Sequence, residues 1–263
     1  MSYRKSVFLA VLPILLAGTA TLHGADETFD KAEQALSSKD YGTAVSLLER
    51  AVQSDPDSLR NASEYRQAVL RQTVAAHPKE GSTADFDKEI SFFEKLVADH
   101  PTSSNAYLNY GFAYVDKIPA AGSITQVIMA NTALTQFTKS IELKPTWIAL
   151  YTRGNSYLYW PKVFGRAGLG VTDLERAYAM QKSEGKKSYH VRVYVSLGDG
   201  YWKTENLDKA KAIWKEGLTQ FPDSQALKDR LSKQGEDLDN YINNVLDPNK
   251  RVDTDLKELW RQQ

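Results

Sequence analysis

The clearest pattern of apolar and small residues lies near the end of the chain. Tyr194, Leu197, Gly198 and Tyr201 are followed by Ala210, Trp214, Gly217 and Pro222. Spacings of three and four residues place each set on one face of a helix. Gly198 allows two helices to approach closely, and Trp214 is expected to fill the space between them. The pattern predicts a hairpin of packed helices, with Pro222 in the first turn of the next helix.

Related patterns precede this hairpin. The same order of small and aromatic residues occurs in three earlier units. They are Tyr107, Tyr110, Gly111 and Tyr114 followed by Ala133, Phe137, Ser140 and Pro145; Leu150, Gly154 and Tyr157 followed by Gly170, Leu174, Ala177 and Lys182; and Ala32 and Ala35 followed by Tyr41, Ala44, Leu48, Ala51 and Pro56. A further, degenerate unit ends in Phe86, Phe93, Leu96 and Pro101. The order of small and aromatic residues resembles the tetratricopeptide repeat (TPR), with Tyr where Trp is usual.

The resemblance implies an all-α fold, a helical-repeat solenoid of about five hairpins with capping helices at its C-terminal end. The repeats are expected at residues 26–57, 58–102, 103–146, 147–187 and 188–223, and the capping helices at 224–263. All of residues 26–263 would then form a single domain.

Later repeats exceed the standard unit of about 34 residues, so they carry insertions. Ser123 and Gln126 predict a capping box, so residues 124–143 are expected to form one long helix. Residues 160–168 predict an irregular loop with two exposed aromatic side chains. Residues 79–83 predict a polar turn before a helix that begins near Ala84. The insertions either line one rim of a binding face or reflect neutral drift.

The last 30 residues predict two further helices. Residues 235–246 carry Leu238, Tyr241, Ile242 and Val245 on one face. Asp253 is expected to begin a short helix in which Leu256, Leu259 and Trp260, with Val252 just ahead, form one stripe. These helices are expected to cover the open end of the solenoid. Alternatively, the stripe docks onto a partner or forms a homo-oligomer.

The first 25 residues are typical of a signal peptide. Arg4 and Lys5 precede an uncharged apolar run of about 12 residues, too short to cross a bilayer as a helix. Cleavage is expected after Ala20 or Ala25, which would make the protein periplasmic or secreted. With no cysteine after the run, a lipoprotein anchor is excluded. A buried N-terminal helix is the alternative interpretation.

Composition excludes several kinds of chemistry. The 33 basic and 33 acidic residues balance, which argues against a nucleic-acid partner. The absence of cysteine excludes disulfides, thiolate metal sites and thiol nucleophiles. His77, His100 and His190 lack a second histidine at metal-binding spacing, and no phosphate-binding or hydrolase motif is present. The chain is therefore predicted to be no enzyme and to need no cofactor or metal.

In TPR arrays the first helix of each hairpin lines a concave groove, and the resemblance implies the same here. The candidate residues for binding a ligand or partner are Asn109, Phe112, Asp116, Tyr151, Asn155, Tyr159, Arg192, Asp199 and Trp202. Their mixture of aromatic and polar types is typical of recognition surfaces, although packing against the next hairpin would also explain several of them. The lysine that some TPR proteins use to clamp a C-terminal carboxylate is missing.

Two functions fit these features. The favoured one is an exported scaffold that binds a protein or peptide partner in the groove. The alternative is a periplasmic accessory protein of a solute transport system, which would enclose a small apolar ligand around Phe112, Leu158 and Tyr159.

Overall fold

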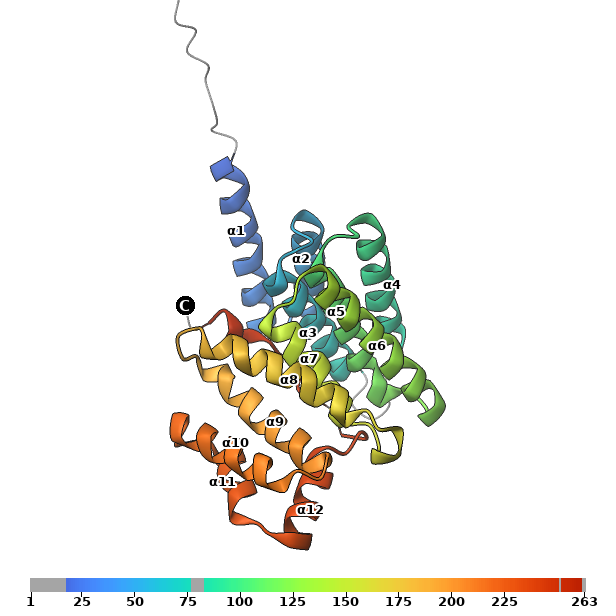
Figure 1. The fold of residues 1–263 in the computed structure, drawn as a ribbon. Helices are drawn as coiled ribbons and strands as arrows, with labels where there is room; N and C mark the ends of the chain where they lie inside the picture. The colour runs from blue at the N-terminus through green and yellow to red at the C-terminus, as the bar shows by residue number, and fades with distance from the viewer. Residues whose placement is uncertain (1–17, 77–82, 251, 262–263) are drawn as a thin grey trace, which may run out of the picture.

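The computed structural model describes residues 18–76, 83–250 and 252–261. This part of the chain is all-helical, with twelve α-helices that pack as sequential hairpins (Figure 1). The helices are α1 Gly18–Ser37, α2 Tyr41–Ser54, α3 Leu59–Ala76, α4 Ala84–Asp99, α5 Ser104–Lys117, α6 Ser123–Leu143, α7 Trp147–Leu158, α8 Ala167–Lys182, α9 Val191–Lys203, α10 Leu207–Gln220, α11 Gln225–Ser232 and α12 Gly235–Val245. Short 3₁₀ turns lie at η1 Ile118–Ala120, η2 Lys162–Phe164, η3 Ser188–His190 and η4 Lys257–Leu259.

Glycines set the distance between the two helices of a hairpin. A Cβ atom on Gly198 would lie 2.0 Å from Nε1 of Trp214, and one on Gly111 would lie 2.4 Å from the ring of Phe137. Both distances are far below van der Waals contact. The close approach that the sequence predicts at Gly198 is therefore confirmed, and the buried aromatic ring occupies the space that a side chain would need.

A shared turn joins three of the hairpins to the helix that follows. The N–H groups of Ser58, Ser103 and Ser224 donate to the carbonyls of Asp55, His100 and Phe221, at 3.0 to 3.1 Å. Each turn has proline in second position, where its fixed φ is favourable. Pro222 is thus not in the first turn of the next helix, as the sequence predicts, because α11 begins only at Gln225.

The insertions differ from expectation in detail. The long helix α6 and the start of α4 at Ala84 are confirmed, while residues 79–82 lie outside the described residues. No capping box forms, because the side-chain amide of Gln126 donates to the carbonyl of Ala121 at 2.9 Å. In the loop before α8, Phe164 is exposed as predicted, but Trp160 is buried, with the Arg166 guanidinium 3.7 Å from its ring.

The predicted signal peptide falls mostly outside the described residues. Helix α1 begins at Gly18 and contains both expected cleavage positions, Ala20 and Ala25. Export therefore stays a prediction. None of the described helices has the length and apolar character needed to cross a membrane.

The end of the chain departs most from prediction. Helices α11 and α12 continue the array, with Leu238 and Ile242 buried. The helix expected from Asp253 is not formed, because residues 252–256 have no regular secondary structure and only the single turn η4 follows. We call residues 252–261 the C-terminal segment. It does not cover the open end of the array but runs back to the region of α1 (Figure 1).

The glycine contacts lead to a stability prediction. We expect Gly198→Ala to lower the free energy of unfolding by about 1–3 kcal/mol, because the new methyl group overlaps the Trp214 indole. Gly168→Ala is the matched control, since nothing lies within 4 Å of its Cβ position in α8. Urea unfolding of both variants checks this. Equal stability of the two would show that the helices are not in contact at Gly198.

Candidate functional site

The inner face of the array holds the C-terminal segment between its two halves. On one side the segment contacts α1, α3 and α5, and on the other it contacts α9. Thr254 and Leu256 are 3% and 5% exposed, so both are buried against the rest of the chain. We call the inner surface that receives the segment the groove. It is formed by side chains from the first helices of several hairpins.

Arg66 on α3 is the polar centre of the groove and is fully buried. Its Nη1 donates to Oδ2 of Asp116 at 2.7 Å, and its Nε donates to Oδ1 of Asn109 at 2.9 Å. Nη2 donates to the backbone carbonyl of Thr254 at 3.2 Å. The Thr254 hydroxyl donates to Oδ1 of Asp116 at 2.5 Å and accepts from Gln67 at 3.1 Å. Thr254 is thus bound through both its backbone and its side chain.

Charges on the segment match charges on both walls of the groove. The Lys257 ammonium lies 3.0 Å from Glu64 of α3 and 3.5 Å from Glu33 of α1. Arg261 lies 3.0 Å from Glu33 as well. On the opposite wall, Arg192 of α9 pairs with Glu258 and lies 3.6 Å from Asp253. The α1 and α3 wall is therefore acidic where the segment is basic, and the α9 wall is basic where the segment is acidic.

Three of the sequence-predicted site residues belong to the Arg66 centre. Asn109 and Asp116 are its hydrogen-bond partners, and the Arg66 guanidinium lies 4.5 Å from the Phe112 ring centroid. All three are buried, at 0%, 2% and 6% exposure. In this conformation the residues predicted to bind a ligand are engaged with one another, and two atoms of Thr254 complete their contacts.

Four others form a second group on α7, at its C-cap and on α9. Tyr151 stacks on Trp147 with 5.2 Å between ring centroids, and burial raises its pKa against the opposing effect of nearby Arg192. Asn155 accepts a hydrogen bond from Ser196 at 2.9 Å. Burial raises the pKa of Tyr159 to about 12. Arg192 connects this group to the segment through Glu258.

The last two predicted residues hold the capping helices instead. Asp199 accepts two hydrogen bonds from Arg230 of α11, at 2.5 and 2.6 Å. The indole N–H of Trp202 donates to Asp239 of α12 at 2.8 Å, and Trp202 is 7% exposed. Packing against the following helices, the alternative that the sequence leaves open, therefore accounts for Asp199 and Trp202.

Sequence reasoning missed the residues that contribute most to the groove. Arg66, Gln67 and Glu64 lie on α3, in the degenerate repeat, where all nine residues from 61 to 69 are buried. A helix that is buried on every side has no polar face to reveal its orientation. The only available signal for these residues was an arginine and a glutamate two positions apart. The segment has no glycine at a helix contact, so the sequence did not show which side of the helix faces its neighbour.

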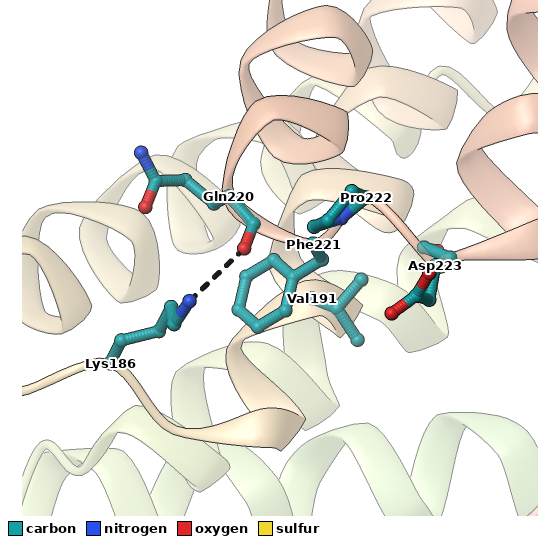
Figure 2. A pocket seen from close by; sticks show the side chains of 7 residues that line it. Lys186, Val191, Gln220, Phe221, Pro222 and Asp223 are labelled. Carbon is teal, nitrogen blue, oxygen red and sulfur yellow. Dashed lines mark hydrogen bonds between the residues drawn. The ribbon is translucent and has the colours of Figure 1, made fainter.

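The structure also has a pocket away from the groove. Lys186, Val191, Gln220, Phe221 and Pro222 surround a shallow cleft between the loop before η3 and the end of α10 (Figure 2). The Lys186 ammonium donates to the Gln220 carbonyl at 3.3 Å across it. Phe112 and Leu158, which the small-molecule hypothesis assigns to a pocket wall, are packed in the apolar core. Within the described ranges no cluster of three or more His, Asp or Glu residues is arranged to hold a metal.

Solved structures with the same architecture identify the fold. A thermophilic TPR protein from Thermus thermophilus, TTC0263, superposes with a TM-score of 0.54 at 18% identity, covering 79% of this chain and 97% of that one. The fold is a TPR array. YrrB, described as a TPR protein with an unusual peptide-binding site, matches with a TM-score of 0.50 at 13% identity, over 82% of this chain and 100% of its own.

A TPR protein from Parabacteroides merdae also matches, with a TM-score of 0.50 at 14% identity, over 78% of this chain and 70% of that one. No protein-family model matches the sequence, and no curated protein matches it. At these identities the likeness concerns the TPR fold and carries no information on what the groove binds.

Glu89 on α4 faces the Arg66 centre and gives a prediction of pH dependence. It is fully buried, and neither carboxylate oxygen has a hydrogen-bond partner among the described residues. Burial raises its pKa well above 4.5, nearby Asp116 raises it further, and Arg66 lowers it. The folded protein therefore binds this proton more tightly than the unfolded chain does, and the group costs stability as the pH rises above about 4.5.

We expect Glu89→Gln to raise the free energy of unfolding at pH 7 and to have little effect at pH 4. The gain should be about 1.4 kcal/mol for each pH unit above 4.5 over which the buried group stays protonated, up to pH 7. Glu94→Gln, on the exposed face of the same helix, is the control. Urea unfolding at both pH values measures the difference. A loss of stability at pH 7 would mean that the Glu89 carboxylate is ionised and favourably paired.

Proposed function

We propose that the protein is an exported TPR scaffold that binds an extended segment of a partner protein in its groove. TPR proteins are generally non-catalytic scaffolds for protein or peptide binding, and we assign this chain no catalytic activity. One observation supports peptide binding in particular. The groove already holds ten residues of polypeptide, with a hydroxyl group, a carbonyl, a leucine and four charged side chains each in contact with the array.

The contacts are of the kind that recognise peptides. Arg66 donates to a backbone carbonyl, which any peptide offers, while Asp116 and Gln67 bind a side-chain hydroxyl, which only some residues offer. Backbone contacts supply affinity and side-chain contacts supply specificity. The small-molecule function has no comparable support, because Phe112 and Leu158 are buried in the core and Tyr159 is packed against it.

A photo-crosslinking residue tests the proposal in the protein's own host. Tyr151 lies beside Arg192 and Glu258, so p-benzoylphenylalanine in its place points toward the groove. Tyr178 on α8, whose hydroxyl donates to Glu216 of α10, is the matched control on the second-helix face. We expect irradiation to join a partner polypeptide to the protein labelled at position 151, several-fold more than at position 178. Equal or greater labelling at position 178 would place the binding surface outside the groove.

A further inference from the structure

The C-terminal segment is attached differently from the helices before it. Helix α12 is held by buried apolar residues, Leu238 and Ile242. The segment has one deeply buried apolar side chain, Leu256, with Leu259 and Trp260 partly buried against the core. Its other contacts are hydrogen bonds and ion pairs. Residues 248–250, which connect the two, are exposed. A few apolar side chains surrounded by hydrogen bonds and ion pairs, on an exposed connection, are typical of a bound peptide more than of a core element.

Arg66 has partners in the groove that do not depend on the segment. Without Thr254, Arg66 would still donate to Asp116 at 2.7 Å, to Asn109 at 2.9 Å and to Ser63 at 3.5 Å. The buried guanidinium therefore keeps its counter-charge when the segment leaves. Departure of Lys257 would open Glu64 to water, which solvates a carboxylate well.

We propose that the C-terminal segment is a built-in competitor for the groove and that its chemistry defines the external ligand. This inference rests on the proposed function. The ligand is a peptide with serine or threonine at the place of Thr254, a leucine-like residue two positions later, and then a basic and an acidic residue in a 3₁₀ turn such as η4. The hydroxyl binds Asp116, the basic side chain binds Glu33 and Glu64, and the acidic side chain binds Arg192.

The tether makes this competition strong. A segment joined by a short connection has an effective concentration near the groove in the millimolar range. A free peptide of the same sequence therefore meets a groove that is mostly occupied, and its apparent affinity falls in proportion to the open fraction. A partner gains access when it matches the groove better than the segment, or when the segment is held elsewhere.

A peptide of residues 249–261 with a fluorescent label tests the inference by anisotropy. Lys257→Glu in the full chain should release the segment, since position 257 then repels Glu33 and Glu64. Lys228→Glu, the same charge change on the exposed face of α11, is the control. We expect the Lys257→Glu protein to bind the peptide at least tenfold more tightly than the wild type or the control. Equal affinity in all three folded proteins would overturn the proposal.

The peptide itself provides a specificity control. Replacing the residue that corresponds to Thr254 by valine removes the hydroxyl bound by Asp116 and Gln67. We expect binding to the Lys257→Glu protein to weaken at least tenfold. Unchanged binding would show that the peptide attaches without the Arg66 centre, and would contradict the ligand chemistry proposed here.

A second form of the experiment applies if Lys257→Glu does not fold. A protease site in place of residues 247–250 allows the folded protein to be cut, so that the segment becomes a separate peptide. We expect excess labelled peptide to replace the cut segment, as native mass spectrometry would show. A cut segment that never exchanges would be an integral part of the fold, which would overturn the proposal. A wild-type dimer in which each copy binds the segment of the other would also overturn it, because the competition would then not occur within one chain.

These results separate the two proposals. Failure of the peptide to bind Lys257→Glu, together with cross-linking of a partner at position 151, would reject the competitor and retain the scaffold. Tight peptide binding with no cross-linked partner would retain the competitor's contacts and reject the scaffold function.

Discussion

The Arg66 guanidinium lies fully buried where α3, α5 and the C-terminal segment meet, and its positive charge has to be balanced there. Leaving such a charge unpaired costs several kcal/mol. Asp116 supplies the counter-charge, and Asn109 and Ser63 accept hydrogen bonds from other N–H groups of the same guanidinium. The Phe112 ring centroid lies 4.5 Å from the guanidinium carbon. The carbonyl of Thr254 is the further acceptor. Arg66 thus fixes the position of Thr254, while ion pairs and apolar contacts hold the rest of the segment.

This arrangement changes how the array behaves mechanically. In a repeat solenoid each unit contacts mainly its neighbours, so opening at one point need not affect a distant one. Here Arg66 and Thr254, 188 positions apart, are hydrogen-bonded, and Arg192 is paired with the same segment. The segment thus links the N-terminal hairpins to α9 across the groove.

The sequence was sufficient for the hairpins because their contacts are local. Gly198 and Trp214 belong to one hairpin, and the spacing of small and aromatic residues records how they meet. The groove is formed by contacts between distant residues. The helical spacing of Leu256, Leu259 and Trp260 predicted a last helix. Thr254 instead contacts Arg66, Gln67 and Asp116, and residues 252–256 have no regular secondary structure. No local pattern in the sequence records those three partners.

The most direct test of this account is a distance measurement between the C-terminal segment and α1. The chain has no cysteine, so spin labels can be attached without background at Ser37→Cys and at Gln262→Cys, the position after Arg261. Ser37 lies one turn from Glu33, which pairs with Arg261 at 3.0 Å. Double electron–electron resonance should give one short, narrow distance distribution if the segment occupies the groove. A broad distribution extending to long distances would contradict the account, because the segment would then be free of the groove in solution.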